Sequence, residues 1–280
     1  MERLDRFLAE ESDNSRSEVK KLIRAGRVSV NGLTDLRPEL KIDPQQDRVL
    51  ADGIRIVPAG RILIMMNKPA GVLSATQDQR DRTVIDLVRE PYAKKLFPAG
   101  RLDKDTEGLL LLTNDGALAH HLLAPGKHVT KTYFAVLSGK PDAGIADRFR
   151  EGMDIGEKRI TLPAHLVFLP QGEECREETD DGAGMPADET QRMLRLCRIT
   201  LKRGDYDRCG EDTCCAAVAL TEGKFHQIKR MFASCGREVR YLKRIAMGDL
   251  ALDPDLERGA YRPLTQQEIA CLERGTGQGA

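Results

Sequence analysis

FPAGRLDKDTEGLLLLTNDG, residues 97–116, is the stretch that says most about how this chain folds. It places a carboxylate, Asp103, on a polar loop just before Leu109–Leu112, an apolar run with the length of a buried strand. Asn114 or Asp115 can then cap a following helix. An arginine two residues before an aspartate is usually a surface ion pair. Arg101 and Asp103 therefore acquire functional meaning only from the rest of the chain.

On both sides of this stretch, strand-like and helix-like segments follow one another without a regular β-α-β repeat. Such mixing predicts an α+β domain over residues 59–280, built on a mixed, mostly antiparallel sheet. The expected strands are 62–66, 108–113, 131–137, 194–202 and 215–221, and the expected helices are 84–89, 117–123 and 227–233.

Residues 1–58 have the pattern of a separate small α/β module. Apolar residues at helical spacing predict a first helix near the N-terminus. Ser15 followed by Glu18 fits a capping box, which predicts that a second helix begins there, and Gly26 offers the left-handed residue that ends it. The segment 49–56, interrupted by Asp-Gly, predicts a β-hairpin.

The formal net charge of the chain is zero, although nucleic-acid-binding proteins usually carry a basic excess. The charges are unevenly distributed, however. Residues 224–244 are strongly basic, and residues 173–189 form an acidic block. We interpret 171–192 as an acidic loop insertion and 275–280 as a disordered tail. Overall neutrality is thus compatible with a basic face that binds nucleic acid.

The second expected helix carries five cations away from its apolar stripe. A solvated helix face and a surface that contacts phosphates are both compatible with this pattern. The five residues are Arg16, Lys20, Lys21, Arg24 and Arg27.

Several classes of protein are disfavoured by what the sequence lacks. No stretch approaches the roughly 18 apolar residues of a membrane-spanning helix, and no signal-peptide pattern begins the chain, so we expect a cytoplasmic protein without a membrane partner. The seven cysteines are expected to be thiols, and the irregular spacing of Cys209, Cys214 and Cys215 disfavours zinc. Without a glycine-rich phosphate loop or dinucleotide motif, we expect no cofactor and no metal.

Two families match these motifs in order and spacing. Residues 4–8 and 15–32 resemble the S4 RNA-binding domain. The segment Gly100–Gly116 resembles the catalytic motif of RNA pseudouridine synthases. Three further segments, Asn67–Val72, Lys131–Tyr133 and Gly223–Phe232, are similar to that family's other motifs. The chain is therefore identified as an S4-domain pseudouridine synthase, an isomerase that acts on RNA.

The resemblance implies a role for each candidate residue. Asp103 would be the nucleophile, Tyr133 would stack on a flipped uracil, and Lys229 would pair with Asp103 and keep it ionised. Whether Asp103 attacks the ribose C1′ or the base C6, or instead removes a ribose proton, stays open. Arg101 would fill the space left by the base or hold the neighbouring backbone. Lys224 and Arg230 would bind RNA, and His226 would be structural. The reaction is redox-neutral, so the resemblance implies no cofactor.

Within that family, the layout resembles the group of ribosomal small-subunit pseudouridine synthase A. The N-terminal S4-like module, Lys229 and the ending Gly259–Leu264 carry this likeness. It implies a uridine of 16S ribosomal RNA as substrate, of the pseudouridine(516) synthase type, in a small-subunit assembly intermediate, with the protein acting as a monomer. Two alternatives remain: the same chemistry on 23S RNA, and a non-catalytic RNA-binding assembly factor.

Overall fold

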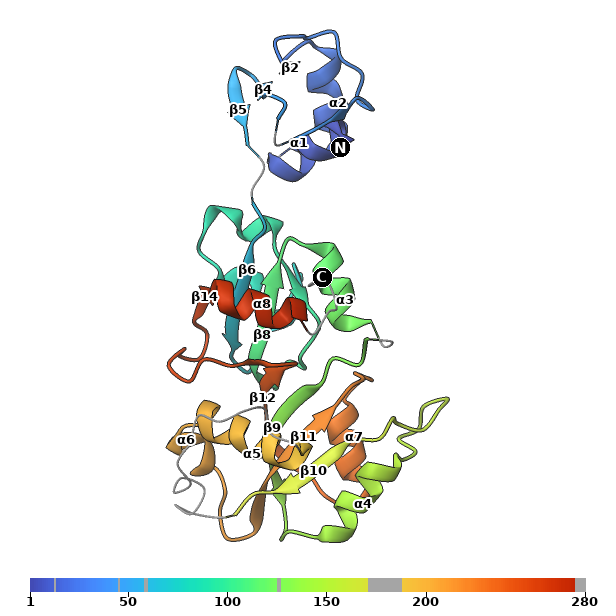
Figure 1. Cartoon of the computed structure of the whole chain (residues 1–280), viewed down its shortest axis with the longest axis vertical. Helices are drawn as coiled ribbons and strands as arrows, with labels where there is room; N and C mark the ends of the chain where they lie inside the picture. The colour runs from blue at the N-terminus through green and yellow to red at the C-terminus, as the bar shows by residue number, and fades with distance from the viewer. Residues whose placement is uncertain (13, 45, 58–59, 125–126, 171–187, 275–280) are drawn as a thin grey trace. The chain divides into compact units, whose positions relative to one another are not determined.

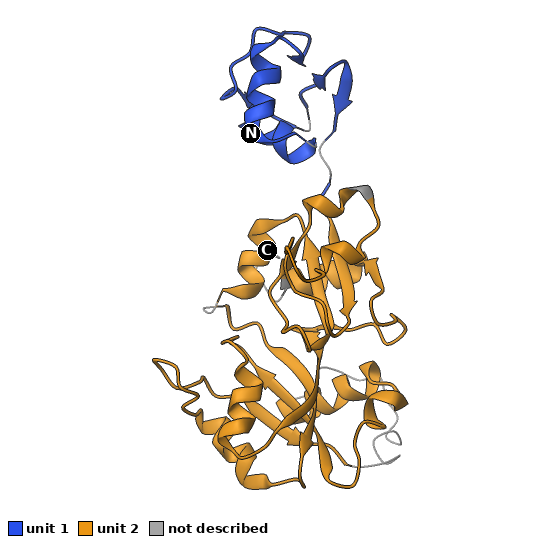
Figure 2. Ribbon diagram, turned by 180° about the vertical axis from the view of Figure 1, so that it is seen from behind, with its two compact units in different colours: residues 1–61 blue, residues 62–280 orange. Residues whose placement is uncertain are grey.

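The chain divides into two units, Met1–Arg61 and Ile62–Ala280 (Figure 2). The computed structural model describes the chain apart from residues 13, 45, 58–59, 125–126, 171–187 and 275–280. The expected boundary at 58–59 and the expected tail at 275–280 lie outside the described residues, as does most of the expected acidic loop.

The first unit packs two helices against short strands. Its elements are β1 (Glu2–Arg3), α1 (Leu4–Glu11), α2 (Arg16–Arg24), β2 (Val28–Val30), β3 (Lys41–Ile42), β4 (Val49–Ala51) and β5 (Ile54–Ile56). The predicted capping box is present: the Ser15 hydroxyl accepts from the Glu18 backbone, and the Glu18 carboxylate accepts from the Ser15 backbone. The β4–β5 hairpin turns at Asp52-Gly53, both with positive φ, as predicted from the sequence.

The second unit is built on one large sheet (Figure 1). Its strands are β6 (Leu63–Lys68), β7 (Phe97–Ala99), β8 (Glu107–Thr113), β9 (Lys131–Ser138), β10 (His165–Phe168), β11 (Thr213–Leu220), β12 (Val239–Met247), β13 (Leu250–Ala251) and β14 (Tyr261–Pro263). The order is β10-β11-β9-β12-β8-β6-β14, with β13 beside β12 and β7 beside β8. Only the β12–β8 pairing is parallel among the described strands. The predicted mixed, mostly antiparallel α+β sheet is confirmed.

Helices cover both faces of this sheet, so its strands are apolar on both sides. The helices are η1 (Ile85–Leu87), η2 (Pro91–Lys95), α3 (Gly116–Leu123), α4 (Ala143–Glu151), α5 (Glu189–Thr200), α6 (Arg203–Tyr206), α7 (Gln227–Ser234) and α8 (Gln266–Arg274). In the half formed by β10, β11, β9 and β12, α4 and α7 pack on one face and α5 packs on the other (Figure 1). In the half formed by β8 and β6, α3 and α8 cover one face, and the η1–η2 segment covers the other.

The two halves meet where β8 runs parallel to β12, and the glycine of the quoted stretch permits this contact. Gly108 lies opposite Arg244 with φ near +101°. A Cβ on Gly108 would lie 2.2 Å from the Arg244 carbonyl oxygen, a separation that backbone atoms cannot tolerate. Glycine is therefore required at the strand that directly follows the Asp103 loop.

Three expectations about local structure were wrong. Residues 194–202, predicted as a strand, lie mostly in α5. The alternation of leucine and arginine suggested a strand, but Met193, Leu196, Cys197 and Thr200 are the buried residues, and their spacing is helical. Because α5 begins at Glu189, the end of the predicted 171–192 loop is helical as well. The predicted helix 84–89 is a single 3₁₀ turn, Ile85–Leu87.

Candidate active site

A buried lysine holds the loop that carries Asp103. Lys68, at the end of β6, is fully buried, and its ammonium donates to the backbone carbonyls of Pro69, Asp103, Lys104 and Thr106 at 2.9–3.3 Å. Burial lowers the pKa of Lys68 to about 8, while nearby carboxylates act in the opposite direction. The group is therefore mostly protonated at neutral pH and can donate to all sides. This anchor fixes the backbone on both sides of the Asp103 side chain.

The segment that follows β6 holds the same loop from a second side. The Ser74 hydroxyl bonds both the N–H and the C=O of Leu102, at 3.0 and 2.9 Å. The Gly71 N–H donates to the Lys104 carbonyl at 2.7 Å. Leu102 is itself buried in the core. The family-like segment Asn67–Val72 thus supports the Asp103 loop through its backbone contacts and through Lys68.

Asp103 forms an ion pair with Lys229, and this lysine also contacts a second carboxylate. The Lys229 ammonium lies 3.2 Å from Asp103 Oδ2 and 2.5 Å from Asp105 Oδ1. The side chains of Asp103 and Lys229 are about a quarter exposed, whereas Asp105 is 71% exposed. Burial raises the pKa of Asp105, but the hydrogen bond and charge of Lys229 outweigh it and lower that pKa overall. Lys229 therefore lies between one sheltered and one solvated carboxylate.

The pair lies in a cleft that is partly polar and partly apolar. The cleft is partly open to solvent, and its cavity volume is about 80 Å³. Tyr133, half-buried on β9, lines it together with Leu220, Ile228 and Leu242. His226, which immediately precedes α7, also lines it, with Nε2 3.7 Å from Asp103 Oδ1. The structure thus brings together Asp103, Tyr133 and Lys229 from three different parts of the sequence.

Three residues expected to bind RNA have different surroundings. Arg101 is exposed and lines the same cleft. Lys224 also lines it, but its ammonium donates to the backbone carbonyls of Arg159 and Ile160. The Arg230 guanidinium pairs with Glu157 at 2.7 Å and donates to the carbonyl of Ile155. Lys224 and Arg230 thus hold the 155–160 segment beside the cleft, a contact that the sequence did not reveal.

The first unit presents its predicted cations mostly to solvent. Arg16, Lys21 and Arg24 are exposed on α2, and Lys20 is partly exposed. Arg27, just after this helix, is exposed but forms a two-point ion pair with Asp52 at 2.6 and 2.7 Å. Four of the five cations therefore lie on one helix, and the fifth already has an acidic partner.

Lys68 and Ser74 are the residues that sequence reasoning missed. A lysine at the end of the apolar run Leu63–Met66 was a detectable signal, because an unpaired charge in such a strand needs several acceptors. Ser74 gave no signal in the sequence. Its contact with Leu102 depends on how the segment after β6 folds back toward the Asp103 loop.

Metal ligands do not gather in the described part of the chain. No group of three His, Cys, Asp or Glu side chains is placed there to hold an ion. Cys214 and Cys215 are neighbours on β11 and enter hydrophobic clusters on opposite faces of the sheet. The six described cysteines form no disulfide. None of the described helices is long and apolar enough to cross a membrane.

Comparison with known families and proteins shows the family to which the chain belongs. The sequence profile of the RNA pseudouridylate synthase family matches residues 62–234, and that of the S4 domain matches residues 2–44. An RNA pseudouridine synthase of Bacillus subtilis, described as uncharacterized, is 39% identical over 96% of this chain and 98% of its own length. Ribosomal small subunit pseudouridine synthase A of Escherichia coli K12 is 34% identical over 96% of this chain and 99% of its own.

A relative from a third bacterium and a solved structure extend the similarity. Ribosomal small subunit pseudouridine synthase A of Yersinia pestis is 36% identical over 96% of this chain and 97% of its own length. A crystal structure of a pseudouridylate synthase covers 97% of this chain and 100% of its own, with 32% identity and a TM-score of 0.58.

Proposed function

The chain belongs to the RNA pseudouridylate synthase family, and from this premise we propose that it isomerises one uridine of 16S ribosomal RNA with Asp103 as the nucleophile. The observation that carries the proposal is the Asp103–Lys229 pair, 3.2 Å apart, in a cleft lined by Tyr133. A carboxylate fixed beside a cation and an aromatic ring is suited to attack a flipped nucleotide.

Pseudouridine formation breaks the bond between base and sugar, rotates the base and rejoins it through carbon. The target atoms are covered in a stacked helix, so the nucleotide must be extruded into a pocket. The cleft would hold the extruded uracil against Tyr133 and the apolar side chains of Leu220 and Leu242. Arg101, exposed at the cleft, would occupy the space that the base leaves in the RNA.

Asp103 would form a covalent intermediate, which divides one difficult substitution into two easier steps. The sequence leaves three routes open, and they stay open here: attack on ribose C1′, attack on base C6, or removal of a ribose proton. Lys229 would keep Asp103 ionised when the RNA excludes water from the cleft. Lys68 would keep the carboxylate in place, because it bonds the backbone of Asp103 and of its neighbours. The Tyr133 phenol could help remove the C5 proton.

The choice of 16S RNA rests on two relatives whose names assign them to the small ribosomal subunit. We assign residues 1–58 to RNA binding and 59–280 to catalysis. The exposed cations of α2 would contact phosphates of a small-subunit assembly intermediate in the cytoplasm, with the protein acting as a monomer. A purely RNA-binding role is disfavoured, because a binding protein has no need for a carboxylate held this firmly. A map of pseudouridines in ribosomal RNA distinguishes a 23S substrate from a 16S substrate.

A map of pseudouridines in ribosomal RNA tests the proposal. Cells that lack the protein should lose one site in 16S RNA, at uridine 516, and wild-type protein should restore it. Asp103→Asn should not restore it, because removal of a catalytic nucleophile lowers turnover by roughly 10⁴-fold or more. An unchanged map would refute the enzymatic role. Loss of a 23S site would transfer the substrate to the large subunit.

A further inference from the structure

Phe225 is an exposed aromatic residue beside the cleft. It is 72% exposed, more than any other aromatic residue in the described part of the chain. Its ring stacks on that of His226, with centroids 3.8 Å apart and planes 17° from parallel. His226 therefore covers one face of the Phe225 ring, and the high exposure shows that much of the rest is open to solvent.

The backbone at His226 is unusual and links this stack to the cleft. His226 has φ near +50° and ψ near 34°, in the left-handed region that residues other than glycine seldom adopt. Its imidazole nevertheless faces the catalytic loop, with Nε2 3.7 Å from Asp103 Oδ1. Non-glycine residues held in this conformation occur often at functional sites. The two stacked rings thus extend from the Asp103 carboxylate to solvent.

The segment 155–160, which Lys224 and Arg230 hold near Phe225, carries exposed cations besides Glu157, whose carboxylate is paired with Arg230. Lys158 and Arg159 are exposed on the 155–160 segment. The Lys224 ammonium, one residue before Phe225, ties that segment down through the carbonyls of Arg159 and Ile160. An aromatic face beside a cleft, with exposed cations on a nearby segment, suits unpaired nucleic acid, because rings stack on bases while cations neutralise phosphates.

We propose that the Phe225–His226 stack binds the base of the nucleotide adjacent to the target uridine. This inference rests on the proposed function, since it requires an RNA whose uridine enters the cleft. Extrusion of the uridine breaks the stacking of its neighbour on one side. The open face of Phe225 offers that neighbour a replacement partner, which holds the distorted RNA in register with Asp103.

Steady-state kinetics and binding with a short RNA that contains the target uridine test the stack. Phe225→Ala should raise KM and Kd about tenfold, the scale of one lost base–aromatic stack, and change kcat by less than about threefold. Phe225→Trp should keep wild-type values because it preserves a flat face. Ile199→Ala is the matched control: it also removes an exposed apolar side chain, 40% exposed, from a helix that packs on the opposite face of the sheet.

An abasic nucleotide on either side of the target identifies the base that is bound. Wild-type affinity should fall about tenfold for one of the two abasic RNAs, and Phe225→Ala should cause no further loss on that RNA. An unchanged KM and Kd for Phe225→Ala would overturn the proposal. The proposal would also fail if the affinity losses from Phe225→Ala and from the abasic nucleotide multiplied on both abasic RNAs. If wild type modifies a different RNA, the 16S assignment fails, and the same comparison on that RNA still decides whether the stack exists.

Discussion

Two lysine–aspartate pairs lie near strand β12, on opposite faces of the sheet, and their surroundings differ. Asp103–Lys229 opens into the cleft, with side chains about a quarter exposed and atoms 3.2 Å apart. Asp205–Lys243 lies at 2.8 Å, with side chains only 4% and 7% exposed. Leu242, adjacent to Lys243, lines the cleft, as expected for a strand whose side chains alternate between faces.

The buried pair belongs to a polar network, because Asp205 also contacts the Tyr241 hydroxyl at 3.4 Å and Arg258 at 3.6 Å. The Tyr241 hydroxyl donates to Glu107 at 2.7 Å, and Arg258 pairs with the same carboxylate at 3.0 Å. Burial, followed by the hydrogen bond to Glu107, raises the pKa of Tyr241 far above its usual range. Each charge of this network has a partner within the protein. The cleft pair is partly solvated and leaves Asp103 accessible. The same two residue types thus stabilise the fold on one face and are available for the proposed chemistry on the other.

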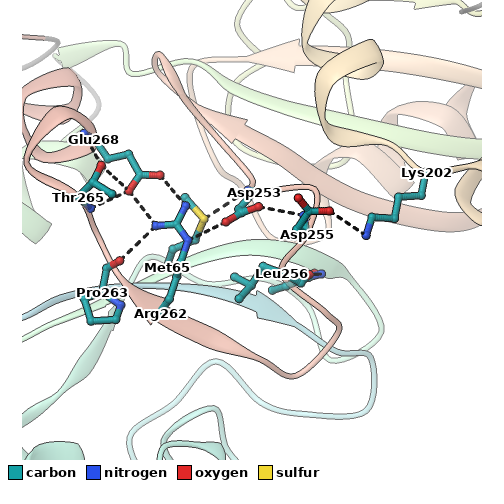
Figure 3. A network of polar contacts seen from close by, with 10 residues as sticks. Met65, Lys202, Asp253, Asp255, Leu256, Arg262, Pro263, Thr265 and Glu268 are labelled. Carbon is teal, nitrogen blue, oxygen red and sulfur yellow. Dashed lines mark hydrogen bonds and ion pairs between the residues drawn. The ribbon is translucent and has the colours of Figure 1, made fainter.

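A third group of charges is about as exposed as the cleft pair and lies elsewhere in the domain (Figure 3). Arg262 on β14 binds Asp253 at 2.7 Å and Glu268 of α8 with two bonds of 2.7 and 2.8 Å. These three side chains are 20–30% exposed. The same figure shows Lys202 and Asp255, a far more exposed pair at 3.5 Å. Because each of the four sites pairs a cation with a carboxylate, they allow the effect of burial on stability to be tested.

The largest loss of stability is expected for Lys243→Met. The substitution leaves Asp205 buried without its main cation, which costs about 3–5 kcal/mol of unfolding free energy. Urea denaturation followed by circular dichroism measures the change. Lys202→Met, at the exposed pair, is the matched control and should change stability by less than about 0.5 kcal/mol. Equal effects of the two substitutions would contradict the structural role of the buried pair.

Lys229→Met should show the reverse pattern. Loss of the cation beside Asp103 should lower kcat by roughly 10²–10³-fold, as for other electrostatic groups in active sites. Because the side chain is partly exposed, the unfolding free energy should stay within about 0.5 kcal/mol of wild type. Rates of pseudouridine formation and urea denaturation on the same protein samples measure both quantities. Lys229→Arg, which keeps the charge, should retain more activity than Lys229→Met. If Lys229→Met lost as much stability as Lys243→Met, the contrast between the cleft pair and the buried pair would be contradicted.

Arg262→Met should cause a small loss of stability that depends on pH. The hydrogen bond from Arg262 lowers the pKa of Glu268 from 4.5 to about 2. A carboxyl group with a lowered folded pKa stabilises the protein above its unfolded pKa, and this contribution is lost as the pH falls from about 4.5 to about 2. The variant should lose about 1 kcal/mol at pH 7. Its difference from wild type, measured by urea denaturation from pH 7 downward, should shrink in that window; a constant difference would contradict the assignment.

Local patterns in the sequence were sufficient for much of the fold. The Ser15 capping box, the hairpin at Asp52-Gly53 and the apolar run after Asp103 each depend on neighbouring residues, and the structure contains all three. The error at 194–202 arose because that segment fits a strand locally, whereas its burial against β11 and β12 selects the helical face. Local propensity cannot reveal which face a distant strand will cover.

The sequence by itself indicated the family of this protein and its candidate site residues, because Asp103, Tyr133 and Lys229 occur in motifs that are specific in residue type and order. Only the tertiary structure decided how these residues are held and used. Lys68 and Ser74 act on the Asp103 loop across about 30 residues, and Lys243 differs from Lys229 in its burial and in its partners. These properties depend on contacts between distant segments and on exclusion of water, and neither is encoded at a single position in the chain.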